Sequence, residues 1–152
     1  MKYIKTTIKE YLFEDLKFRV DKTPSEYSFD TIYYMNENSQ EIGYIEYLYT
    51  GSNISEEVYG KEFYISMIKV HKEFRGNDYS SEMIEHIKKY AKEKGANVIT
   101  LKVDTGLGFT ERNPTKGLEK LYLKNGFDYM FSEEELEEDD TRNPGAMEYL
   151  IT

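Results

Sequence analysis

The sequence predicts an α+β fold with a mixed, mainly antiparallel sheet, one parallel crossover and flanking helices. The first half of the chain consists of runs rich in β-branched and aromatic residues, which favour β-strands. The second half contains an amphipathic stretch over residues 81–94, and a buried apolar run over residues 98–103 follows it closely. Another apolar run precedes the amphipathic stretch, and the order strand, helix, strand is typical of a parallel crossover.

Length and composition restrict the class of protein. The 152 residues suit a single domain over residues 1–152, because no linker or internal repeat divides them. The formal net charge of −9 argues against a nucleic-acid partner, since phosphate affinity comes mainly from clustered Lys and Arg. The chain has no apolar run of membrane-spanning length and no signal-peptide pattern. We therefore expect a cytoplasmic protein without a membrane partner.

Two residue types carry further information. The absence of Cys excludes disulfides, thiol catalysis and Cys-ligated metals. The chain has 15 Tyr, 8 Phe and no Trp, so tyrosine should supply much of the buried area. The hydroxyl groups of these tyrosines then need hydrogen-bond partners or water.

The first half should contain five strands. The polar stretch Asn36–Gln40 has turn chemistry, so the strands on either side of it should form a hairpin. The centre of the last strand, Ile65–Ile68, is mostly apolar, as expected of a central strand. The predicted strands are Thr7–Phe13, Leu16–Asp21, Phe29–Asn36, Glu41–Thr50 and Glu62–Val70.

The second half should begin with the main helix, Ser81–Lys94. Ser80 or Ser81 can cap its start, and Gly95 suits the position after its end. Asn113 before Pro114 is a good start for a second, short helix that ends at Gly126. The other segments are strands at Val98–Val103, Phe127–Ser132 and Met147–Ile151 and an acidic loop at Glu133–Asp140.

The turn that joins the strand ending at Val70 to the main helix is rich in Gly, Asn, Asp and Ser. Successive backbone N–H groups in such a turn can point at one anion, aided by the positive end of the helix. Arg75 adds a fixed positive charge. A phosphate or pyrophosphate is the expected ligand, although the same residues also suit an ordinary capped helix.

Two segments together resemble the GNAT N-acetyltransferase superfamily. Ile68-Lys69-Val70 followed by Arg75-Gly76 is similar to the family's hydrophobic-x-Val strand end and its Arg-Gly-x-Gly-x-Gly/Ala turn. Leu121-Tyr122 through Gly126-Phe127 is similar to the Leu-Tyr-x-x-x-Gly-Phe segment at the end of the family's next helix. The resemblance covers roughly residues 41–152. Within the turn, Asp78 and Ser80 stand where the family usually has glycine, and later in the chain Thr115 stands where the family often has Asn.

The resemblance implies acetyl-CoA as cosubstrate. A backbone N–H near Met67 or Ile68 would polarise the thioester carbonyl. Ile68 and Val70 would pair with the pantetheine arm of the coenzyme as if adding a strand to the sheet. The turn amides would bind the pyrophosphate, and the residues carried over for this role are Arg75, Gly76, Asn77, Asp78, Tyr79 and Ser80.

The resemblance also assigns the proton transfers. Tyr122 corresponds to the family's usual general acid, which protonates the leaving thiolate, although it also lies on the apolar face of its helix and suits a core position. For the general base, Glu46 is the first candidate and Glu62 the second, and both also suit solvated strand positions. His71 lies in the turn and His86 on the polar side of the main helix, so both are weaker candidates. Their spacing predicts no metal site.

The predicted function is therefore N-acetylation of a primary amine by direct transfer from acetyl-CoA, which the absence of Cys also favours. The connection between the last two strands commonly borders the acceptor site in this family. Its acidic residues, Glu133–Asp140, would attract a cationic acceptor such as a polyamine, an aminoglycoside or a lysine-bearing tail. The same residues also suit a solvated loop. Because family members are often dimers, the resemblance also suggests a homodimer.

Two alternatives stay open on the sequence alone. The first is a catalytically inactive protein of the GNAT fold whose acidic, tyrosine-rich surface binds a partner. The second is an acidic mimic of nucleic acid, which is less consistent with the lysines interspersed over most of the chain.

Overall fold

The structure is a computed structural model that describes residues 16–23, 28–49, 61–103 and 112–152. Within these ranges one sheet has seven strands in the order β1-β2-β3-β4-β5-β7-β6, and only the β4–β5 pair is parallel. The predicted mixed α+β fold is confirmed, while the predicted strand Thr7–Phe13 lies outside the described residues. The strands are β1 (Lys17–Asp21), β2 (Asp30–Met35), β3 (Glu41–Leu48), β4 (Glu62–Val70), β5 (Val98–Lys102), β6 (Asp128–Tyr129) and β7 (Ala146–Leu150).

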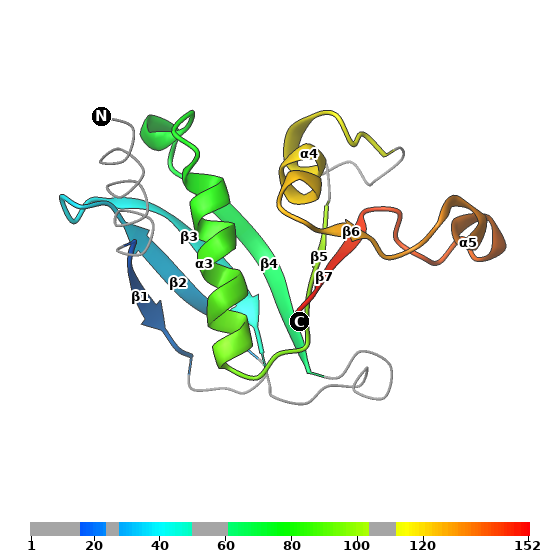
Figure 1. The fold of residues 1–152 in the computed structure, drawn as a ribbon, viewed down its shortest axis with the longest axis horizontal. Helices are drawn as coiled ribbons and strands as arrows, with labels where there is room; N and C mark the ends of the chain where they lie inside the picture. Colours follow the sequence, from blue (N-terminus) through cyan, green and yellow to red (C-terminus); the bar gives the residue numbers. More distant parts are fainter. Residues whose placement is uncertain (1–15, 24–27, 50–60, 104–111) are drawn as a thin grey trace.

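Helix α3 (Tyr79–Glu93) makes the crossover between the parallel strands and lies along one face of the sheet (Figure 1). The other helical segments are the single 3-10 turn Lys72–Phe74, α4 (Gly117–Lys124) and α5 (Glu133–Glu138). No helix in the described part of the chain is long and apolar enough to cross a membrane.

The core lies between the sheet and α3. Helical spacing places Met83, Ile84 and Ile87 on one face of α3, and all three are fully buried. They pack against sheet residues that include Ile45 and Phe63, which are also fully buried. The residues that point to this side of β3 and β4 therefore define the core face of the sheet.

Tyrosine supplies part of this core, as the composition predicts. Tyr47 from β3 and Tyr90 from α3 are both buried, and their hydroxyl oxygens lie 3.3 Å apart. Tyr34 is fully buried, and its hydroxyl lies 2.8 Å from Nδ1 of His86. His86 is thus half-buried among aromatic rings, with Phe18 at 4.3 Å between ring centroids, and its expected position on the polar side of the helix is wrong.

The environment of His86 keeps its imidazole ring neutral. Burial, with a further contribution from nearby Lys89, lowers the pKa of His86 to about 4. Burial also raises the pKa of Tyr34 well above its usual value, so the phenol keeps its proton. The Tyr34 hydroxyl can therefore donate to the unprotonated Nδ1 of His86.

The start of α3 differs in detail from the sequence expectation. The cap residue is Asp78, with φ +60° and no side-chain capping bond, whereas Ser80 and Ser81 lie inside the first turn. The end agrees with the prediction, because Gly95 follows the helix with φ +95° and donates to the Lys92 carbonyl. The αL conformation of Asp78 fits the tolerance of aspartate for this region.

Two later elements also differ. The predicted loop Glu133–Asp140 contains helix α5, because Ser132 and Glu135 form a reciprocal capping box that stabilises its first turn. The strand predicted at Phe127–Ser132 is reduced to β6, the two residues Asp128 and Tyr129.

Helix α4 starts at Gly117 rather than at Asn113–Pro114, which form a turn before it. Glu119 ties this turn to the helix, because its buried carboxylate accepts the Asn113 N–H at 2.5 Å. Glu119 also accepts the hydroxyl proton of Tyr129 at 2.6 Å. This carboxylate therefore anchors the start of α4 to β6.

Candidate active site

The site lies where β4 and β5 separate. The two strands pair only from Glu62 opposite Val98 to Ile65 opposite Leu101, although β4 continues to Val70. Figure 1 shows the strands diverging beyond this point, with α4 near the open end. A cavity of about 240 Å³ is found here, lined by Ile68, Lys69, Val70, Arg75, Ser80, Leu118 and Leu121. We call it the β4–α4 cleft.

Strand β4 has a β-bulge at Ser66. The register with β3 passes from Glu46 opposite Met67 to Tyr47 opposite Ile65, so Ser66 is an extra residue. Ser66 and Met67 are both exposed, and Ser66 Oγ donates a hydrogen bond of 2.7 Å to Glu46 Oε1. A bulged residue is left out of the ladder, so the backbone here can offer polar groups to a ligand.

Beyond β4, the chain enters α3 through a turn with positive φ at Gly76 and Asp78. Gly76 has φ +84° and open space around its Cα, which allows a ligand to approach the backbone closely. The first helical hydrogen bond runs from the Glu82 N–H to the Asp78 carbonyl at 3.2 Å. The N–H groups of Tyr79 and Ser80 precede that bond and have no intrahelical acceptor. With the helix dipole, they make this end attractive to an anion.

Two cations line the cleft beside these amides. Arg75 Nε donates to the Val70 carbonyl at 3.0 Å, which fixes the guanidinium against the end of β4. Lys69, which sequence reasoning did not select, lines the same cleft. Its position immediately before Val70, at the end of the central strand, is the feature of the sequence that could have indicated it. Together the two side chains place two positive charges on the wall of the cleft.

Not every predicted coenzyme-binding residue lines the cleft. The Asn77 side chain donates to the Phe74 carbonyl at 3.2 Å, and the Tyr79 ring packs edge-on against Phe74 at 6.3 Å. Both side chains therefore stabilise the turn itself. Asp78 is exposed, and its place in the turn is set by the left-handed backbone rather than by its carboxylate.

Tyr122 lies on α4, one residue beyond Leu121, and only 4% of its surface is exposed. Its ring packs against Phe127 at 5.6 Å between centroids. Burial raises the pKa of Tyr122 above its usual value, so the phenol stays protonated. Leu118 and Leu121 line the cleft from this helix, whereas Tyr122 is not part of its lining.

Contacts with α3 hold the far end of α4. The Lys88 ammonium of α3 donates to the Asn125 carbonyl and lies 4.4 Å from the centre of the Tyr149 ring. The Asn125 amide in turn donates to Ser81 Oγ at 3.3 Å and to the Leu121 carbonyl at 2.8 Å. These contacts fix α4, and with it one wall of the β4–α4 cleft.

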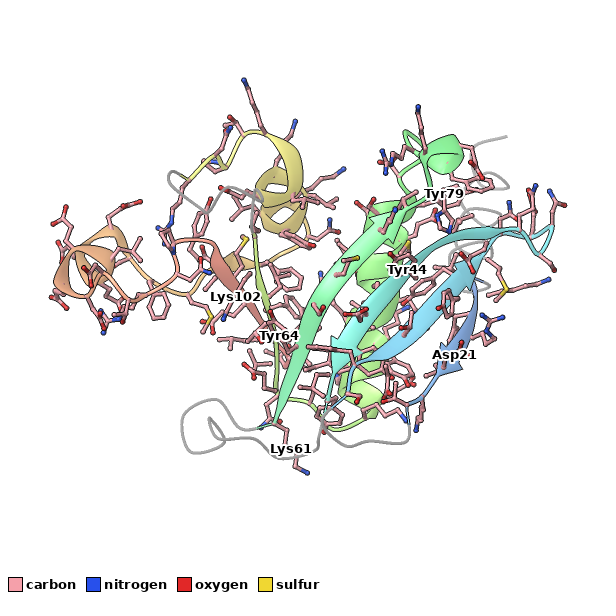
Figure 2. All side chains as sticks on the ribbon, turned by 180° about the vertical axis from the view of Figure 1, so that it is seen from behind. Asp21, Tyr44, Lys61, Tyr64, Tyr79 and Lys102 are labelled. Atoms are coloured by element: carbon pink, nitrogen blue, oxygen red, sulfur yellow. The ribbon has the colours of Figure 1, made fainter. Side chains whose placement is uncertain are left out.

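A second cavity, of about 420 Å³, lies on the other side of the bulge along β4. We call it the β4–β7 cavity. Figure 2 shows two of its lining residues, Tyr64 and Lys102, on the sheet as seen from the side away from α3. Glu62 lines it too and accepts a hydrogen bond of 2.9 Å from Thr100. The two cavities thus approach the bulge from its two sides.

The two base candidates occupy different places. Glu46 lies beside the bulge through its bond to Ser66, whereas Glu62 lies at the start of β4 in the larger cavity. Of the weaker candidates, His71 is paired with Glu41 at 2.6 Å. The described residues contain no group of three or more His, Asp or Glu side chains that could hold a metal ion.

The comparisons with known proteins agree with this geometry. The family model described as "Acetyltransferase (GNAT) family" matches residues 3–127, and the chain therefore belongs to the GNAT acetyltransferase family. No curated protein sequence matches the chain significantly.

Solved structures share the fold at low sequence identity. A putative acyl-CoA N-acyltransferase from Klebsiella pneumoniae has a TM-score of 0.56 at 13% identity, covering 99% of this chain and 86% of that one. Nourseothricin acetyltransferase has a TM-score of 0.55 at 16% identity, covering 91% and 85%. The PaiA N-acetyltransferase from Thermoplasma acidophilum, solved with coenzyme A, has a TM-score of 0.50 at 18% identity. The match covers 79% of this chain and 59% of that one.

Proposed function

We propose that this chain transfers an acetyl group from acetyl-CoA to a primary amine by direct attack. The observation that carries the proposal is the separation of β4 from β5 beyond Ile65, with a bulge at the point of separation. The β4–α4 cleft runs from there to the start of α3. The family assignment and the coenzyme A bound to a structural neighbour support the same activity.

The residues of the cleft fit coenzyme A chemically. Lys69 and Arg75 would neutralise the pyrophosphate, and the amides at the start of α3 would bind its oxygens. Ile68 and Val70 present the edge of β4 to the pantetheine arm, whose amides can pair with a strand. When bound, the coenzyme supplies an acetyl thioester, whose carbonyl carbon is open to attack by an amine.

The bulge would place a backbone N–H near Met67 against the thioester oxygen. A single fixed donor there stabilises the negative charge that develops as the amine attacks. Glu46 is our first candidate for the base that removes the amine proton, because the Ser66 hydroxyl holds its carboxylate at the bulge. Glu62, four residues before Ser66, is the second candidate.

Tyr122 is our candidate for the acid that protonates the coenzyme thiolate. Burial keeps its phenol protonated, and its neighbours on α4 line the cleft. This role requires the hydroxyl to reach the coenzyme sulfur when the coenzyme is bound. Apo geometry often tightens in this way when substrate binds.

The β4–β7 cavity is our candidate for the acceptor site. Its lining includes Met130 and Phe131 before helix α5 and Thr141 after it. The acidic helix α5 lies in the sequence between these lining residues. Its carboxylates would attract the protonated form of the acceptor amine toward the cavity.

The direct test is an assay of free thiol release from acetyl-CoA by the whole chain with a panel of primary amines. We expect thiol release that requires both acetyl-CoA and the amine. The initial rates should fit a mechanism with a ternary complex of enzyme, acetyl-CoA and amine rather than one with an acetylated enzyme intermediate. If acetyl-CoA binds but no amine causes thiol release, the inactive GNAT-fold alternative gains support and the proposal fails.

A further inference from the structure

Positively charged side chains outnumber carboxylates in the lining of the β4–β7 cavity. The chain carries a formal net charge of −9, yet the charged residues that line this cavity are Lys102, Arg142 and a single carboxylate, Glu62. Glu62 already accepts the hydroxyl hydrogen bond of Thr100. The lining therefore holds two cations and one carboxylate.

Lys102 is the better placed of the two cations. Arg142 lies 5.4 Å from the centre of the Phe131 ring, and acidic residues of α5 and the following turn are within 3.9–4.0 Å of its guanidinium. Lys102, by contrast, is exposed at the end of β5, and no carboxylate among the described residues lies within 4.0 Å of its ammonium. A cation of this kind on a cavity wall is suited to an anionic ligand group.

The register places Lys102 close to the point of acetyl transfer. Leu101 is the last residue of β5 paired with β4, opposite Ile65, and the bulge residue Ser66 follows Ile65 directly. Lys102 therefore stands level with the bulge, and neighbouring strands lie about 5 Å apart before they diverge. An anion held by Lys102 would lie near an amine positioned for attack at the bulge.

From this juxtaposition we propose that the acceptor is an α-amino acid whose carboxylate is bound by Lys102, with Arg142 as a second contact. The inference rests on the proposed function. An α-amino acid carries its amine and its carboxylate on one carbon, which matches the closeness of Lys102 and the bulge. Tyr64 and Phe131 also line the cavity, so an apolar or aromatic side chain of the acceptor would pack there.

The step balances as an ordinary amide formation. The unprotonated α-amine attacks the thioester carbon, a C–N bond forms and the C–S bond breaks. Glu46 takes the proton lost by the nitrogen, and Tyr122 supplies a proton to the departing thiolate. The products are an N-acetyl amino acid and free coenzyme A.

The test compares acceptors that differ only in the carboxylate. L-phenylalanine, L-phenylalaninamide and phenethylamine share one side chain, and L-leucine with its amide and isopentylamine form a second set. The whole chain is assayed for thiol release at saturating acetyl-CoA. We expect kcat/KM for the free acid to exceed that of its amide and its decarboxylated amine by about tenfold or more.

Lys102→Met is the matching variant, because it keeps the length and apolar stem of the side chain. It should raise KM for the free acid by about tenfold and leave kcat/KM for the decarboxylated amine unchanged. Lys61→Met is the control, since Lys61 is exposed just before β4, at the end of that strand far from the bulge (Figure 2). The Lys61 variant should change neither KM for the free acid nor kcat/KM for the decarboxylated amine.

Two results would overturn the inference while leaving the proposed function intact. One is equal or better turnover of the amides and decarboxylated amines. The other is turnover of unrelated primary amines together with no turnover of any compound in the phenylalanine and leucine series. If no amine at all releases thiol, the proposed function itself fails, so the two failures are distinguishable.

Discussion

The Ser66 hydroxyl of β4 donates a 2.7 Å hydrogen bond to the Glu46 carboxylate of β3. Ser66 is the extra residue of the bulge, so this bond joins the irregular point of one strand to a charged group on the next. It leaves one carboxylate oxygen of Glu46 available. A general base needs such fixed geometry, because proton transfer is sensitive to orientation.

We therefore expect Glu46→Gln to lower kcat by roughly a hundredfold or more, because the amide cannot accept a proton from the substrate amine. KM for acetyl-CoA should stay near the wild-type value. Glu62→Gln is the matched comparison, since it makes the same change in the larger cavity. A greater loss of kcat in Glu62→Gln than in Glu46→Gln would assign the base to Glu62 instead.

Tyr122→Phe should also lower kcat by about a hundredfold, because it removes only the hydroxyl that would protonate the thiolate. Tyr149→Phe is the control, since the Tyr149 ring packs against the same Phe127 at 5.6 Å. Because burial raises the pKa of Tyr122, deprotonation of this phenol should cause no loss of kcat as pH rises toward the ordinary tyrosine range. An unchanged kcat in Tyr122→Phe would remove it as the acid.

His86 should make the stability of the fold depend on acidity. Its pKa is about 4 in the folded chain and near 6.5 when unfolded, so between these values the unfolded state binds the proton more readily. The free energy of unfolding should therefore fall by up to about 3 kcal/mol as pH drops through that window. Urea unfolding at a series of pH values measures this loss.

His86→Gln should flatten that pH dependence, because glutamine does not titrate. His71→Gln provides the control, since this other histidine is paired with Glu41, whereas His86 is half-buried among aromatic rings and bonded to Tyr34. An equally steep loss of stability in His86→Gln would show that other groups cause it.

Gly43 allows β3 to approach the end of β4. A Cβ at this position would lie 2.1 Å from the Lys69 carbonyl oxygen, a backbone atom that cannot move alone. Gly43→Ala should therefore lower the free energy of unfolding by about 1–3 kcal/mol. It should also weaken acetyl-CoA binding, because Lys69 and Val70 line the cleft. Unchanged denaturant midpoint and affinity would contradict this account of the glycine.

The sequence predicts the central elements well because their signals are local and strong. The spacing of Met83, Ile84 and Ile87 defines α3 without any tertiary information. The acidic composition of residues 133–140 suggests a solvated loop and hides α5, although Ser132 and Glu135 provide a capping-box signal. His86 is predicted wrongly for another reason. Helical spacing alone places it on a polar face, because its neighbours Phe18 and Tyr34 come from strands that are distant in the sequence.

The candidate site is only partly visible in the sequence. Arg75 and Gly76 follow a motif, so they can be selected in advance. The bulge at Ser66, by contrast, depends on how β4 pairs with β3, and no residue pattern marks it. Lys69 and Lys102 matter because of where strands separate, which is a property of the sheet.

Acetyl-CoA binding is tested most simply by calorimetric titration of acetyl-CoA into the whole chain. We expect one site per chain with a micromolar Kd. Lys69→Ala should weaken it by about tenfold through loss of a phosphate contact, whereas Lys72→Ala, which changes an exposed lysine of the same turn, should not. Absence of binding at millimolar acetyl-CoA would contradict the proposal that this chain uses acetyl-CoA.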